Sequence, residues 1–400
     1  MQKHGWMAVL AICAGCASDG QDGTAGPEGP AGTAGTNGSD GTDGDPGANG
    51  PVGPQFALPA VYSLTNATGG NQVAAYTRAS SGSVTRKGRF TTSANGTGAG
   101  LGSQGAIVFD ARSQRFFAVN AGSDSISMLA LDASGELTTL STVASGGVRP
   151  VSITARDGVV YVANSGNLTG TPVNANISGF KVQGDALVAI AGSTRPLSAT
   201  SDVRPTNIGF SPDGKFLVVT ERFANKLSTF AVQNGVAQAG SFQTSSGGQP
   251  FAFDWSPEGH LIVAEVGTGA ANGSSASSYS ISTTGVLTPI TSSLPTGQTA
   301  ACWIVTAGGF AYISNTGSAN ITGLVVNENG TLALREASGI TATSGAGSID
   351  LAVPPDHGYL YAVAGNPRQL FIYAISSDGS LTPQPALSGM PAAAAGLVVR

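Results

Sequence analysis

The sequence from Phe56 to Arg400 consists of short apolar runs separated by clusters of Gly, Asn, Asp and Ser. The runs are rich in β-branched and aromatic residues, as in VVYVAN from Val159 and FLVVTE from Phe216. Runs of this kind between turn residues are typical of β-strands. The pattern therefore predicts an all-β domain over residues 56–400, built from many short strands.

Two markers repeat along this domain. One is a turn glycine followed within two or three residues by an apolar strand residue, and the other is a hydrophobic strand. Each occurs seven times, about every 50 residues, which is the spacing of a repeat architecture. Four short strands fit between successive markers, so the repeat predicts a seven-bladed β-propeller. The glycines are Gly82, Gly135, Gly184, Gly235, Gly285, Gly330 and Gly379, and the strands start at Val61, Phe116, Val159, Phe216, Leu261, Phe310 and Tyr359.

The ends of the domain predict how the ring closes. An inner strand precedes five of the hydrophobic strands, and these inner strands are led by Arg149, Arg204, Gln249, Gln298 and Gly347. The first hydrophobic strand, at Val61, has no such predecessor, whereas the chain ends in the proline-led run MPAAAAGLVVR from Met390. We therefore expect the C-terminal strand to supply the inner strand of the N-terminal blade, which leaves no free radial edge.

The chain begins with an apolar run from Trp6 to Gly15 behind Lys3 and His4. At about ten residues the run is too short to span a bilayer, and it is typical of a signal peptide. It ends in Ile-Cys-Ala-Gly-Cys, which resembles a bacterial lipobox, so residues 1–15 are expected to be removed and Cys16 to carry the lipid anchor. A plain secretory signal is the alternative. The expected location is the bacterial cell envelope, as an outer-membrane or cell-surface lipoprotein.

Glycine occupies every third position from Gly20 to Gly53, in twelve Gly-X-Y triplets. Only glycine fits at the axis of three wound polyproline chains, so residues 16–55 are predicted to be the lipidated Cys16 and a collagen-like stalk. Between Gly20 and Gln55 the acidic residues have no Lys or Arg to compensate them, and like charges on three adjacent strands repel. Two alternatives stay open, a stalk that forms a homotrimer and a hydrated single-chain tether.

The composition of the chain argues against some classes of partner and cofactor. The chain has 58 glycines, 10% charged residues and a net charge of -5, and it lacks the basic surface that nucleic-acid binding requires. With the signal removed and Cys16 acylated, Cys302 alone remains, so neither an intramolecular disulfide nor a cysteine zinc site is expected. Cys302 lies in the apolar run AACWIV and is expected to be packed rather than nucleophilic. We expect no metal and no cofactor.

The seven repeats, the run SPDGKFLVV from Ser211, the strand-end Glu221 and the run SSDGSLTP from Ser376 resemble the lactonase-type seven-bladed propellers. This family includes bacterial 6-phosphogluconolactonase and fungal carboxymuconate cyclase. The resemblance covers residues 56–400 and implies a site at one mouth of the central channel. There, loops before the inner strands and loops after the second strands converge. Propellers host unrelated functions, so the resemblance specifies the fold better than the activity.

The resemblance implies Glu221 as a catalytic base, with Arg204 and Arg149 holding an anionic substrate or a developing oxyanion. An arginine can fork onto a carboxylate or phosphate, and a carboxylate can take or deliver a proton. The alternative is that strand-end Asn and Glu side chains satisfy the amides of neighbouring loops. The expected ligand-binding residues are Gln249, Glu265, Gln298, Asn164 and Asn315, with Asn120 at an equivalent strand end.

Departures from the family pattern weaken the catalytic interpretation. Members commonly carry histidine after the proline-led start of an inner strand, but Thr206 and Asn207 follow Pro205 here, and His260 and His357 lie in turns expected at the surface. Three functions remain. The first is a surface-anchored binding module for a small anionic or sugar-like ligand or for another protein. The second is an extracytoplasmic lactonase acting on a sugar-acid or muconate-type lactone, and the third is a structural surface protein on a trimeric stalk.

Overall fold

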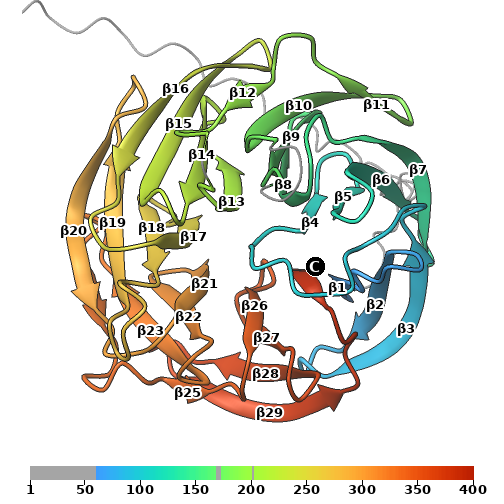
Figure 1. The fold of residues 1–400 in the computed structure, drawn as a ribbon. Coiled ribbons are helices and arrows are strands. Elements are labelled where there is room, and N and C mark those ends of the chain that lie inside the picture. Colours follow the sequence, from blue (N-terminus) through green and yellow to red (C-terminus); the bar gives the residue numbers. More distant parts are fainter. Residues whose placement is uncertain (1–59, 168–172, 201) are drawn as a thin grey trace, which may run out of the picture. The chain divides into compact units, whose positions relative to one another are not determined.

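The computed structural model describes residues 60–167, 173–200 and 202–400, and all regular elements in these ranges are β-strands. Within them the strands form seven antiparallel sheets, five of four strands and two of five. Figure 1 shows these sheets arranged radially around a centre. The predicted all-β, seven-bladed propeller is confirmed. Nothing in this part of the chain qualifies as a membrane-spanning helix, and the predicted signal peptide, Cys16 and Gly-X-Y segment lie outside the described residues.

The blades are numbered here in chain order, and the strands of each are given from the centre outward. Blade 1 contains β30 (Ala395–Val399), β1 (Ala60–Leu64), β2 (Gln72–Arg78) and β3 (Val84–Thr91), and blade 2 contains β4 (Ile107–Asp110), β5 (Arg115–Asn120), β6 (Ser125–Leu131) and β7 (Leu137–Ala144). Blade 3 contains β8 (Pro150–Arg156), β9 (Val159–Asn164), β10 (Asn176–Gln183) and β11 (Ala186–Ala189), with β12 (Arg195–Pro196) also paired to β10. Blade 4 contains β13 (Pro205–Phe210), β14 (Phe216–Glu221), β15 (Lys226–Gln233) and β16 (Val236–Thr244).

The remaining three blades follow the same plan. Blade 5 contains β17 (Pro250–Trp255), β18 (Leu261–Glu265), β19 (Ser275–Ile281) and β20 (Leu287–Pro295). Blade 6 contains β21 (Ala301–Ala307), β22 (Phe310–Asn315), β23 (Asn320–Val326) and β24 (Leu332–Leu334), with β25 (Ala342–Thr343) also paired to β23. Blade 7 contains β26 (Ser348–Ala352), β27 (Tyr359–Ala364), β28 (Gln369–Ile375) and β29 (Leu381–Ser388).

The seven marker glycines lie where the sequence repeat predicts, in the turn between the third and fourth strand of each blade. Their φ angles are all positive, from 59° at Gly184 to 84° at Gly285, a region that glycine enters without steric cost. Several of these turns also join neighbouring blades. The Tyr161 hydroxyl, for example, donates to the carbonyl oxygen of Gly235 in the next blade at 2.8 Å.

The C-terminal strand closes the ring as predicted. Strand β30 pairs with β1, with Val399 opposite Val61, and the Arg400 N–H donates to the Ala60 carbonyl oxygen at 2.9 Å. The inner strands then contact one another in a complete circle that includes β26 with β30 and β30 with β4. The N-terminal blade is thus completed by the last residues of the chain.

The hydrophobic core lies between adjacent blades. All six residues of β14 are buried, and alternate side chains face opposite neighbours. Leu217 and Val219 pack in one cluster with Tyr161 of blade 3, whereas Val218 packs in another with Phe253 of blade 5. Because the sheets bury both faces in this way, the loops at the strand ends are left to carry function.

Candidate functional site

The residue before the inner strand has a left-handed backbone in successive blades. The φ angles are 56° at Arg149, 49° at Arg204 and 52° at Gln249, and Ala300 and Gly347 hold the same position in blades 6 and 7. The carbonyl oxygens of the first three accept the N–H groups of Ser165, Arg222 and Val266, which follow the second strands, at 3.0 to 3.1 Å. This conformation costs a residue with a Cβ about 1–2 kcal/mol. The repeat therefore holds two arginines and a glutamine at the same end of three adjacent blades.

A cleft of about 340 Å³ is lined by both Arg149 and Arg204, two of the residues that the sequence singled out. Its other polar lining residues are Asp124, Ser165, Asn167 and Asp202. The Arg204 guanidinium forms an ion pair with Asp202 at 2.6 Å, and Asp124 accepts the backbone N–H of Arg149 at 2.7 Å. The cleft thus presents two cations, two carboxylates, a hydroxyl and an amide within one small volume.

Arg149 carries the clearest sign of an incomplete site. Its Nε is shielded from solvent, yet among the described residues this N–H has no hydrogen-bond partner. A buried donor without an acceptor costs about 1–3 kcal/mol, so such groups call for an explanation. Because Arg149 lines the cleft, a rotation of its side chain would bring this shielded donor to an acceptor oxygen bound there.

The sequence analysis missed Arg222 and Phe223, which extend the site. The Cζ atoms of Arg204 and Arg222 lie 4.8 and 5.4 Å from the ring centroid of Phe223, whose side chain is 51% exposed. The Arg222 Nε also donates to the Gln249 Oε1 at 3.1 Å, so Gln249 positions the Arg222 guanidinium group. The sequence held a signal for both residues. They follow Glu221 in a loop after a second strand, and the resemblance implies that such loops form the site.

Glu221 does not line the cleft with the two arginines. Its side chain is fully buried, and its carboxylate accepts the Ser198 N–H at 3.1 Å together with the hydroxyl groups of Ser198 and Ser228. Burial raises the pKa of Glu221, and the two serine hydroxyls only partly oppose that change. In this setting the carboxylate holds the loop before blade 4, which is the structural alternative raised for strand-end acids.

Glu265 occupies the equivalent strand end in blade 5 and is held in the same way. Its Oε1 accepts the Ser245 hydroxyl at 2.7 Å and the Gly247 N–H at 2.8 Å, and its Oε2 accepts the Ser275 hydroxyl at 2.7 Å. The side chain is fully buried. Two adjacent blades therefore use the same device, in which a strand-end Glu fixes the loop that leads into the inner strand of its own blade.

The predicted strand-end asparagines are likewise engaged in hydrogen bonds with neighbouring strands. All three are fully buried, and none lines the cleft. The Nδ2 groups of Asn120, Asn164 and Asn315 donate at 2.8, 2.9 and 2.8 Å to Ser127, Asn176 and Thr322 respectively. Their side chains join the second strand to the third at the end nearest the cleft.

Gln298 does not hold the position directly before the inner strand of blade 6, where the sequence pattern predicts it. Strand β21 begins at Ala301, so Ala300 takes the left-handed position that Arg204 and Gln249 occupy in their blades. The Gln298 side chain instead donates to the Ser338 carbonyl oxygen at 3.0 Å and accepts from Asn320 at 2.7 Å. The loop before β21 has no proline to mark the start of the strand, which explains the shift of register.

The segment 101–105 crosses the central channel. The Trp303 indole donates to the Ser103 carbonyl oxygen at 2.9 Å. The Gln104 side chain bonds to both backbone groups of Ile304, at 2.9 and 3.0 Å, and the Gln104 N–H donates to the Thr206 carbonyl oxygen at 2.8 Å. The loop that connects blades 1 and 2 thus binds blades 4 and 6, and we call residues 101–105 the crossing loop.

The space left beside the crossing loop is small and mainly apolar. This cavity of about 220 Å³ is lined by Leu101, Trp303, Ile349 and Ala394, among others. The crossing loop therefore covers the axial position where the resemblance would seat a ligand, and the cleft at Arg149 and Arg204 lies to one side of it.

Cys302 is buried in strand β21, as expected for a packed inner-strand cysteine. Burial raises the pKa of its thiol to about 11, although Arg222 acts in the opposite direction. A thiol with that pKa is almost entirely protonated at neutral pH and is a weak nucleophile. In the described part of the chain, no His, Cys, Asp and Glu side chains form a group that could hold a metal ion.

Comparison with known proteins supports the architecture. The family model described as "Lactonase, 7-bladed beta-propeller" matches residues 173–302. A search of curated protein sequences gave no match.

Several solved structures have the same fold. The periplasmic gluconolactonase of Pseudomonas aeruginosa is 17% identical, with a TM-score of 0.64 over 85% of this chain and 99% of the other. A protein from Lactobacillus plantarum is 19% identical, with a TM-score of 0.68 over 86% and 100%. A Bacteroides uniformis protein provisionally named 6-phosphogluconolactonase is 21% identical, with a TM-score of 0.66 over 86% and 100%. At these identities the likeness shows the fold alone.

Proposed function

We propose that this chain is a ligand-binding propeller that holds a small hydroxylated carboxylate, of the sugar-acid class, in the cleft of Arg149 and Arg204. The observation that carries the proposal is the buried Nε of Arg149, which lacks an acceptor among the described residues. A ligand carboxylate supplies that acceptor, and bonds between ions of opposite charge are about twice as strong as neutral ones.

The other lining groups suit the hydroxyl groups of such a ligand. Asp124 and Asp202 present acceptor oxygens, while Ser165 can donate or accept. Arg204 is already oriented by Asp202 and by its contact with the Phe223 ring, so little side-chain freedom is lost on binding. The volume of about 340 Å³ is at the small end of the range for ligand pockets, which fits a compact solute.

Calorimetric titration with gluconate tests this proposal. Arg149→Gln and Arg204→Gln should each weaken gluconate binding about tenfold or more, since each removes a charge-assisted bond. Sorbitol, which has the hydroxyl groups without the carboxylate, should bind far more weakly. Arg112→Gln is the matched control, because Arg112 is 78% exposed and does not line the cleft. Equal affinities for the parent and both cleft variants would refute the proposal.

An extracytoplasmic lactonase is the second candidate. The family-model match over residues 173–302 and the gluconolactonase named among the similar structures favour it. Against it stand the missing histidines and the serine hydroxyls that occupy the Glu221 carboxylate. The role of Glu221 as a base stays a prediction, and gluconolactone hydrolysis by the parent protein and by Glu221→Gln decides it.

We also propose that the propeller is displayed at the cell envelope through a lipid on Cys16, with residues 16–55 as a stalk. Support comes from the sequence alone, from the lipobox-like run and the twelve Gly-X-Y triplets. Multiple acylation of one cysteine would anchor the protein stably, whereas one chain would not. Cys16→Ser should move the protein out of the membrane fraction. A polyproline-type circular-dichroism signal that is lost cooperatively on heating would support the trimeric stalk. The absence of such a transition would favour the single-chain tether.

A further inference from the structure

A β-bulge on the outermost strand of blade 1 gathers positive charge on one face. Strand β3 pairs Ala75 with Gly88 but Tyr76 with Arg86, so Lys87 is an extra residue in the ladder. Without the bulge, Arg86 and Arg89 would point to opposite faces, because side chains alternate along a strand. With it, both arginines share the face that carries Tyr76, which packs against blade 7.

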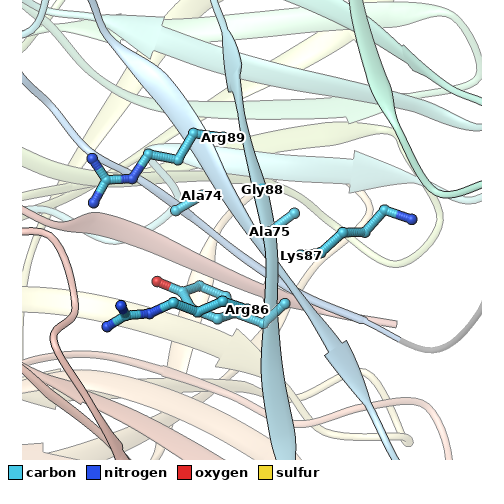
Figure 2. Close-up of a pocket in the computed structure, with 7 residues that line it drawn as sticks. Ala74, Ala75, Arg86, Lys87, Gly88 and Arg89 are labelled. Carbon is cyan, nitrogen blue, oxygen red and sulfur yellow. The ribbon is translucent and has the colours of Figure 1, made fainter.

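Figure 2 shows the result. The side chains of Arg86 and Arg89 extend to one side of the strand, and Lys87 extends to the other. Burial raises the pKa of Tyr76, and the positive charges of Arg86 and Arg89 act to lower it. The two arginines therefore lie together on the side of blade 1 that faces blade 7.

The two arginines differ in their partners. Arg86 donates to the carbonyl oxygens of Ser388 and Gly389, at 2.6 and 2.8 Å, and so ties blade 1 to blade 7. Among the described residues, the side chain of Arg89 makes neither a hydrogen bond nor an ion pair. Its guanidinium is exposed and has all five N–H donors available.

Arg89 shares a second cleft, of about 300 Å³, with Arg368 from the turn between β27 and β28. The Nε of Arg368 donates to the Met390 carbonyl oxygen at 2.9 Å. The two terminal nitrogens of its guanidinium group remain available to donate to a ligand. Thr65 and Thr68 also line this cleft, and no Asp or Glu does. Two guanidinium groups from different blades thus face one hollow that has no carboxylate in its lining.

Protection of the sheet edge accounts for only part of this arrangement. Charged residues on an outermost strand discourage pairing with another chain, which explains Arg86, Lys87 and Arg89 on β3. Edge protection gives no reason for Arg368, which belongs to a turn of another blade and points into the same cleft. Two like charges in one hollow repel, and a bound anion removes that cost.

We propose that this cleft is an anion site in which Arg89 and Arg368 together bind a phosphoryl group. Tetrahedral oxyanions offer several acceptor oxygens to two guanidinium forks, and the threonine hydroxyls can donate to those that remain. The site is separate from the cleft of Arg149 and Arg204 in blades 3 and 4, and its occupancy does not depend on the proposed function. The phosphoryl group could belong to a free phosphate monoester or to a lipid headgroup.

Two binding arms test the site and identify the source. Glycerol 3-phosphate is titrated calorimetrically at low ionic strength, and sedimentation is measured with phosphatidylcholine vesicles that contain or lack phosphatidic acid. Arg89→Gln and Arg368→Gln should each weaken binding about tenfold or more in whichever arm shows it. Arg112→Gln is the matched control, because Arg112 does not line this cleft. Because the side chain of Arg89 makes no intramolecular hydrogen bond, Arg89→Gln should keep the thermal midpoint of the parent protein.

The outcomes separate cleanly. Binding of glycerol 3-phosphate that both variants weaken supports the site with a soluble ligand. Binding only to vesicles with phosphatidic acid, again weakened by both variants, supports the site with a lipid headgroup. Absence of binding in both arms, or binding that Arg89→Gln and Arg368→Gln leave unchanged, overturns the proposal.

Discussion

The indole N–H of Trp303 in blade 6 donates to the carbonyl oxygen of Ser103 at 2.9 Å, across 200 residues of sequence. Next to it, Gln104 satisfies both the N–H and the carbonyl of Ile304, much as a paired strand would. The crossing loop is therefore hydrogen-bonded to blades on both sides of the ring, blades 4 and 6, and it covers the axial position of the channel. The proposed ligand site, at Arg149 and Arg204, lies beside the crossing loop.

Gln104→Ala should destabilise the propeller without affecting the cleft. The substitution leaves the two part-buried backbone groups of Ile304 without partners, and an unsatisfied group of this kind costs about 1–3 kcal/mol. The free energy of unfolding from denaturant titration measures the effect. Gln384→Ala serves as the control, because Gln384 bonds only within its own exposed strand. Equal stability of the two variants would mean that the crossing loop contributes little.

Removal of residues 396–400 should destabilise ring closure strongly. Burial of the Leu397 side chain alone contributes about 1.5–3 kcal/mol, and the deletion also removes the hydrogen bonds between β30 and β1. Leu397→Ala gives a milder version that keeps the strand. The thermal midpoint should fall in the order parent, Leu397→Ala, deletion. A deletion variant that melts with the parent would contradict closure by β30.

The ring and its closure were predictable because they depend on features local in sequence. Each marker glycine signals a turn with positive φ, and each hydrophobic strand is apolar throughout because its two faces meet different blades. The proline-led run at the C-terminus revealed the missing inner strand. Such signals need no knowledge of which residues meet in space.

The site was only partly predictable, for a physical reason. Arg149 and Arg204 could be placed at the same end of the ring because they hold the same position in adjacent repeats, and both line one cleft. Whether Glu221 faces the cleft or a neighbouring loop depends on Ser198, which approaches it from blade 3. The hydrogen bonds of Gln104 with Ile304 likewise join distant segments. No local pattern in the sequence encodes these encounters.

Asp350 should make stability depend on pH. The side chain is 2% exposed, its Oδ2 has no partner among the described residues, and burial raises its pKa well above the ordinary value. The folded state then holds the proton more tightly than the unfolded state does. Stability should therefore fall as pH rises through the ordinary carboxyl range, near 3.9, and on up to the raised pKa, and then level off.

Asp350→Asn removes this titration and should flatten the dependence. Thermal midpoints of the parent and the variant, measured from acidic to mildly alkaline pH, check the prediction. The parent should lose stability relative to Asp350→Asn as pH increases. A constant difference between the two across the whole range would show that Asp350 keeps the same protonation state in the folded and unfolded chain.

Glu221→Gln should leave gluconate affinity within about twofold of the parent, which is the scatter expected for a site without direct contact. Glu265→Gln is the matched variant, because both carboxylates accept serine hydroxyls at the same strand end. The two variants should behave alike in binding and in gluconolactone hydrolysis. If the parent hydrolyses gluconolactone and only Glu221→Gln abolishes the reaction, the lactonase interpretation takes the place of the binding module.

The position of a bound sugar acid tests the central claim most directly. A crystal structure of the propeller with gluconate is predicted to show the carboxylate within hydrogen-bond distance of the Arg149 Nε, with ligand hydroxyl groups near Asp124 or Asp202. That bond would satisfy the one buried donor of Arg149 that has no partner in the described residues. Gluconate bound away from Arg149, or an empty cleft at a saturating gluconate concentration, would contradict the account.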